Sequence, residues 1–90
     1  MKVSNMTSSN GNEVPNQLII RTDTDVYFQS YDTIIARKCF NSGKVFLDKN
    51  KWDYSNTTGK YRNQFLGEGI EETRKKIKSG EYKLVDLNSK

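Results

Sequence analysis

Apolar and polar residues follow each other in short runs along this 90-residue chain, and the runs in its first half are typical of β-strands. β-Branched residues predict a strand over residues 17–22 (QLIIRT), and alternating apolar residues predict a second over residues 26–31. Residues 33–40 and 44–48 are separated by Asn-Ser-Gly at 41–43, which is typical of a hairpin turn. The first half of the chain therefore predicts four antiparallel strands.

Two helices are predicted in the second half. The first begins after Ser55, whose hydroxyl can accept a hydrogen bond from an unpaired backbone N–H, and it places Tyr61 and Phe65 on one face. Gly67 can adopt the left-handed conformation that ends helices. The second helix runs from residue 70 to about residue 79. Glutamates in its first turn and lysines near its end match the helix dipole.

The last apolar run, residues 82–87 (YKLVDL), predicts a strand that returns to the sheet. The element order is then β-β-β-β-α-α-β. The fold class is α+β, a small antiparallel sheet of four strands plus a C-terminal strand, with two short helices. Residues 1–15 are rich in Ser, Asn, Thr and Gly, so we expect a flexible N-terminal tail. Residues 16–90 are expected to form a single domain.

Composition excludes several classes of function. The chain has no His, and its acidic residues do not have the spacing of a metal or calcium site, so we expect no enzyme activity, no cofactor and no metal. Its single cysteine, Cys39, allows no internal disulfide, which favours a cytoplasmic location. No apolar run is long enough to cross a bilayer, so no membrane association is expected. The formal net charge of +4 suits either an acidic partner or a well-hydrated surface.

Residues 52–68 (WDYSNTTGKYRNQFLGE) carry the most specific pattern in the chain: an aromatic pair, a helix cap, two aromatic residues four apart and a closing glycine. This segment resembles the signature of a family of small bacteriophage proteins. The resemblance extends through YFQSYDTIIA (27–36) and KKIKSGEY (75–82). The resemblance implies a phage origin. It does not indicate an activity, and it does not identify site residues.

The leading hypothesis for function is a non-enzymatic, phage-encoded protein that binds a host protein in the infected bacterium. It would inhibit that protein by steric occlusion, and the expected target is a host antiviral defence system of the restriction or CRISPR type. The expected contacts are exposed polar side chains with weak structural roles, together with the edge of the sheet. They are Arg37, Lys38, Lys60, Arg62 and Asn63.

Two other classes remain open. A single-stranded nucleic-acid-binding accessory protein would stack bases on strand aromatics and track phosphates with cations, here Tyr27, Tyr31, Lys38 and Lys44. The structural alternative is that both tyrosines lie beneath a helix and that the lysines are solvated. The third class is a virion or assembly protein. In each case the exposed edges of a small sheet predict weak self-association as a homodimer.

Overall fold

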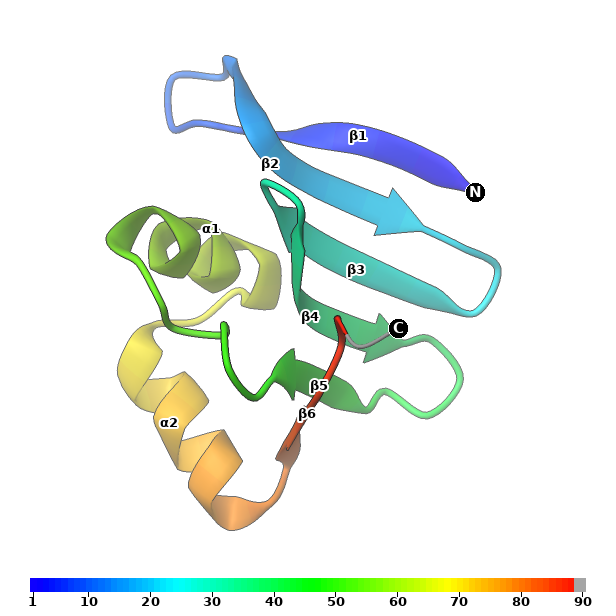
Figure 1. Cartoon of the computed structure of the whole chain (residues 1–90), viewed down its shortest axis with the longest axis vertical. Helices are drawn as coiled ribbons and strands as arrows, with labels where there is room; N and C mark the ends of the chain where they lie inside the picture. The colour runs from blue at the N-terminus through cyan, green and yellow to red at the C-terminus, as the bar shows by residue number, and fades with distance from the viewer. Residues whose placement is uncertain (89–90) are drawn as a thin grey trace.

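Six strands form one sheet, and two helices pack on one side of it (Figure 1). The computed structural model describes residues 1–88. The strands are β1 (Lys2–Thr7), β2 (Glu13–Arg21), β3 (Asp25–Ser30), β4 (Thr33–Cys39), β5 (Val45–Asp48) and β6 (Tyr82–Val85). The helices α1 (Asn56–Leu66) and α2 (Ile70–Ser79) lie between β5 and β6 in the chain. The fold is therefore α+β, with the order β-β-β-β-β-α-α-β.

The order of the strands across the sheet is the same as their order in the chain. The four pairs from β1–β2 to β4–β5 are antiparallel because short turns connect their strands. The turn between β2 and β3 is closed by the backbone N–H of Thr22, which donates to the carbonyl of Asp25 at 2.8 Å. Strand β6 is parallel to β5, because the two helices form the crossover that a parallel connection needs.

Strand β1 corrects the expectation of a flexible tail over residues 1–15. It pairs with β2 from Lys2, opposite Arg21, to the end of the strand. The side chain of Met6 is 5% exposed and belongs to the core. Gly11, with a φ of 82°, lies in the turn that joins β1 to β2. The polar composition of this segment belongs to an edge strand and its turn, so the sheet has one strand more than predicted.

Both helices begin and end where the sequence predicts. The hydroxyl of Ser55 accepts a 3.1 Å hydrogen bond from the backbone N–H of Thr58, which caps α1. Gly67 ends α1 in the left-handed conformation with a φ of 73°, and Gly80 ends α2 in the same way with a φ of 86°. These caps confirm the helix boundaries, because they satisfy backbone groups that a helix end leaves unpaired.

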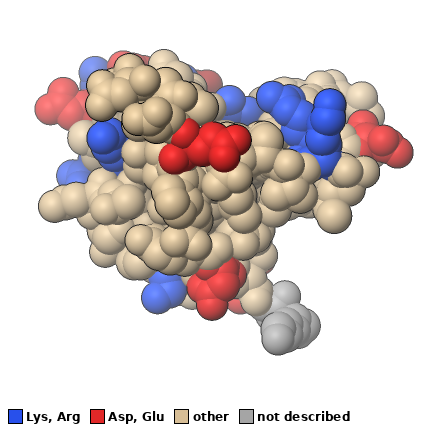
Figure 2. Space-filling model, turned by 90° about the horizontal axis from the view of Figure 1, so that it is seen from above, with Lys and Arg blue, Asp and Glu red and all other residues tan. Residues whose placement is uncertain are grey.

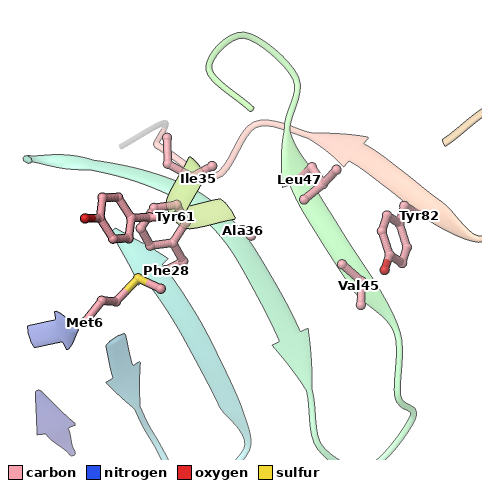
Figure 3. Packing of buried hydrophobic residues seen from close by; sticks show 8 residues of the cluster. All are labelled: Met6, Phe28, Ile35, Ala36, Val45, Leu47, Tyr61 and Tyr82. Atoms are coloured by element: carbon pink, nitrogen blue, oxygen red, sulfur yellow. The ribbon is translucent and has the colours of Figure 1, made fainter. Parts of the chain in front are cut away.

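The core lies on the face of the sheet that carries the helices, since helix residues such as Phe65, Leu66 and Ile77 pack against it. Figure 3 shows its buried side chains. Its buried apolar residues are Met6, Phe28, Ile35, Ala36, Val45, Leu47, Tyr61 and Tyr82. The ring of Phe65 on α1 stacks against Phe28 on β3, with 5.8 Å between ring centroids. Phe65 itself is only half-buried, so the fully buried aromatic of this pair is Phe28.

A half-buried polar cluster joins the two helices to β6. The carboxylate of Glu68, between α1 and α2, accepts hydrogen bonds from Lys76 at 2.6 Å, from the hydroxyl of Thr73 at 2.7 Å and from the hydroxyl of Tyr82 at 2.9 Å. Burial alone would raise the pKa of Glu68, but these three donors lower it below its ordinary value. The same carboxylate raises the pKa of Lys76. The cluster fixes α2 and β6 relative to the end of α1.

Candidate functional site: the helix-free face of the sheet

One row of side chains crosses all six strands on the side of the sheet that carries no helix. Each strand contributes one residue, and each is the Cα partner of the next across the sheet. We call this set the cross-sheet row: Val3, Ile20, Tyr27, Arg37, Phe46 and Lys83. Because successive side chains of a strand point to opposite faces, the row faces away from Phe28 and Ala36, which lie in the core beneath the helices.

A shorter line lies beside the row on the same face. Leu18 is opposite Gln29, and Gln29 is opposite Ile34 across a β-bulge in the β3–β4 pairing. Together with the cross-sheet row, these three residues define the helix-free face. Most of its side chains are half-buried by their strand neighbours, while Val3 is 53% exposed. Within residues 1–88 no helix covers this face, and its apolar and aromatic side chains together with Arg37 make it the candidate interaction site.

Arg37 lies in the middle of this face and is held in place on both sides. Its Nε donates a 2.9 Å hydrogen bond to the carboxylate of Asp25, which is 6% exposed. Its Cζ lies 5.1 Å from the ring centroid of Phe46. Hydrogen bonds from the Thr24 hydroxyl and then from Arg37 lower the pKa of Asp25. The Arg37 charge is therefore paired, and its guanidinium forms part of an ordered surface with Phe46.

Lys38, the next residue, faces the helices. It is opposite Val26 and Val45, and its ammonium donates a 2.8 Å hydrogen bond to the carbonyl of Phe65. Lys38 and Tyr27 therefore lie on opposite faces of the sheet. The four residues expected to bind nucleic acid do not form one surface.

The two tyrosines of that set are also separated. Tyr27 lies in the cross-sheet row, so the expectation that it lies beneath a helix is wrong. Tyr31 lies in the turn between β3 and β4 with a φ of 58°, and it is 55% exposed. Lys44 is exposed in the turn before β5. These positions leave Tyr27 as the member of the set that belongs to the helix-free face.

Arg62 corrects a second expectation, since it was predicted to be an exposed contact. Its side chain is 1% exposed, and one terminal nitrogen donates to the Trp52 carbonyl at 2.8 Å and to Asp53 at 3.0 Å. The other donates to the side-chain oxygen of Asn63 at 3.0 Å. Arg62 thus stabilises the start of α1. Lys60 is exposed, and its ammonium lies 5.5 Å from the ring centroid of Tyr61.

The sequence contained a signal for the burial of Arg62. Thr58, Tyr61, Arg62 and Phe65 have the i, i+3, i+4, i+7 spacing of one helix face. Thr58, Tyr61 and Arg62 are the three buried residues of α1. The hydroxyl of Thr58 lies 3.1 Å from that of Ser30 on β3, which shows that this stripe faces the sheet.

These features define a small α+β domain with one helix-covered and one open sheet face. The model of the DUF8033 family, a family of unknown function, matches residues 1–82, and the chain belongs to that family. The match includes β1 and reaches the start of β6. No curated protein matches the chain, and no solved structure does.

Two further observations concern residues 1–88. No helix in this part of the chain is long and apolar enough to span a membrane. No group of three or more His, Cys, Asp or Glu side chains there is arranged to hold a metal ion.

Proposed function

We propose that this protein is a non-enzymatic binding protein that contacts another protein through the helix-free face of its sheet. The cross-sheet row is the observation that carries this proposal. It provides aliphatic residues at β1 and β2, aromatic residues at β3 and β5 and a paired arginine between them. Aromatic and arginine side chains contribute most to the stability of protein interfaces, particularly near the centre.

The charges on this face favour a protein over a single-stranded nucleic acid. Phosphate binding depends on cations that are free to replace counterions. Arg37 is already paired with Asp25, and Lys38 lies on the other face. Lys83 is then the remaining cation of the cross-sheet row. An apolar and aromatic surface with little free positive charge is better suited to an apolar surface of another protein.

The resemblance of residues 52–68 to small bacteriophage proteins supports a host protein as the partner. A protein of this size that covers the active or binding surface of a larger host protein would inhibit that host protein by steric occlusion. A host antiviral defence system remains the expected target. In this proposal the contacts are the cross-sheet row and its neighbours, and Arg62 contributes through the stability of α1.

Affinity capture from host lysate tests the proposal, with nuclease treatment to remove partners held through nucleic acid. Tyr27→Ala should weaken the affinity for the captured protein by roughly 30-fold or more, because an aromatic residue that dominates the interface is lost. The amount of that protein captured should fall accordingly. Tyr54→Ala is the matched control, because Tyr54 is an exposed aromatic outside the helix-free face. Circular dichroism and thermal melting should show that both variants remain folded.

Two results would contradict the proposal. The first is equal capture by wild type and by folded Tyr27→Ala. The second is loss of the partner on nuclease treatment, together with tight binding to single-stranded DNA that weakens steeply as salt increases. The second result would support the nucleic-acid-binding alternative.

A further inference from the structure

The helix-covered face of the sheet contains a groove that the helices leave open. It lies between strands β1 and β2 on one side and the C-terminal end of α1 on the other, it is open to solvent, and its volume is about 490 Å³. Met6, Ile19 and Phe65 provide apolar walls, and Phe40 lies at its rim with 50% of its surface exposed. In Figure 1 the helices lie to the left, and β2 and β4 run past them to the right.

Two cations line this groove. Arg21 is opposite Val26, and Val26 is opposite Lys38, so the two cationic residues lie in one line across the sheet and point to the same face. They are two strands apart, which is roughly 10 Å between backbones. In Figure 2, the densest group of Lys and Arg side chains lies to the right, the side towards which β2 and β4 run in Figure 1.

Neither cation has a carboxylate partner. Within residues 1–88, neither Arg21 nor Lys38 forms an ion pair, and no acidic residue lines the groove. The Lys38 ammonium donates one hydrogen bond, to the Phe65 carbonyl, and lies 4.7 Å from the centroid of the Phe65 ring. An ammonium has three N–H groups, so two of them remain for a ligand.

The environment of Lys38 favours the arrival of a negative charge. Burial lowers the pKa of Lys38, the carboxylate of Glu68 acts in the opposite direction, and the charge of Arg21 lowers the pKa further. A half-buried ammonium near a second cation is stabilised by an anion, because the attraction is stronger where water is partly excluded. The apolar walls would at the same time bind an apolar group.

We propose that this groove binds a small amphipathic organic acid. Its carboxylate would lie between Lys38 and Arg21, and its aliphatic or aromatic body would lie against Met6, Ile19 and Phe65. The volume is within the range of about 300–1,000 Å³ that is typical of small-molecule sites. The groove and the helix-free face lie on opposite sides of the sheet, so this proposal does not depend on the proposed protein partner.

Titration of the ¹⁵N-labelled protein with octanoate, followed by NMR, tests this site directly. Octanol and octylammonium serve as probes with the same chain and a different head group, all below the concentration at which micelles form. We expect saturable shifts of groove amides with octanoate, weaker shifts with octanol, and the weakest with octylammonium. Equal binding of octanoate and octanol, or no saturable shift at millimolar octanoate, would overturn the proposal.

Substitutions that remove one charge identify the cations involved. Lys38→Met keeps an apolar stem of similar length and should weaken octanoate binding by roughly tenfold or more, because it removes a charge-assisted hydrogen bond. Lys44→Met is the control, since Lys44 is exposed and outside the groove, and it should bind as the wild type does. If Lys38→Met does not fold, Arg21→Met, at an exposed position, tests the same expectation. Unchanged octanoate affinity in the folded variant would refute the assignment.

Discussion

The guanidinium of Arg62 lies over the indole ring of Trp52, with 5.2 Å between its Cζ and the ring centroid, and it also donates a hydrogen bond to the Trp52 carbonyl. The pair connects the second turn of α1 to the segment that precedes the helix. Because Arg62 is buried and also bonded to Asp53, it closes the N-terminal region of α1 with contacts that a shorter side chain cannot make.

Arg62→Ala should lower the free energy of unfolding by about 2–4 kcal/mol, because the Trp52 carbonyl and Asp53 lose their donor and a cavity remains. This loss of stability is smaller than the loss expected when a fully buried ion pair is broken, since Asp53 is 35% exposed. Urea denaturation measures the change. Lys60→Ala, at an exposed position of the same helix, should change stability by less than about 0.5 kcal/mol. A wild-type denaturation curve for Arg62→Ala would refute the structural role of this residue.

Gly59→Ala should increase stability by about 0.5–1 kcal/mol, because alanine is the better helix former. An added Cβ would meet Arg62 Nη2 at 3.6 Å, an ordinary contact distance. Gly67→Ala should instead destabilise by about 1 kcal/mol, since its φ of 73° disfavours a side chain. Thermal melting of the two variants gives opposite shifts if this reasoning is right. A lower melting temperature for Gly59→Ala would show that the space beside Arg62 is required.

Stability should decrease as the solution is acidified. The pKa of Glu68 in the folded protein is below its ordinary value of 4.5, so its contribution is complete above that pH and is lost as the pH falls through the folded pKa. Asp25, lowered from 3.8, acts in the same direction. We therefore expect the free energy of unfolding to decline as the pH falls below about 5. Urea titrations across this range should show a flatter profile for Glu68→Gln, and an unchanged profile would contradict the role of the Glu68 cluster.

Met6→Ala should destabilise the protein by about 2–3 kcal/mol, because Met6 is 5% exposed and packs in the core. Ser4→Ala, at an exposed position of the same strand, should have an effect below about 0.5 kcal/mol. Equilibrium unfolding in urea distinguishes the two. Equal stability of Met6→Ala and the wild type would restore the interpretation of residues 1–15 as a tail.

The features predicted correctly from the sequence are those that neighbouring residues determine. The Ser55 cap and the glycines at 67 and 80 fix helix ends through local backbone geometry. The pairing of β1 could not be predicted in this way, because an edge strand buries few side chains and resembles a polar loop in composition.

The candidate site could be predicted only in part, because it depends on contacts between strands and not on neighbouring residues. Tyr27 and Arg37 were each identified as candidates, but their place beside Phe46 and Lys83 depends on the register of successive strand pairs. A shift of one residue in any pair would move a side chain to the other face. Lys38 illustrates the effect, since it adjoins Arg37 in the chain and lies on the opposite side of the sheet.

The strands lie in the sheet in the same order as in the chain, and this affects how the protein can fold during synthesis. The four pairs among β1 to β5 join strands that follow one another in the chain, so each hairpin can form as soon as its second strand leaves the ribosome. The parallel β5–β6 pair closes a much longer loop, which contains both helices, and it must wait for the end of the chain. We expect pulsed hydrogen exchange to show protection of the β6 amides last. Until that step, β5 would be a temporary edge, open to pairing with another chain.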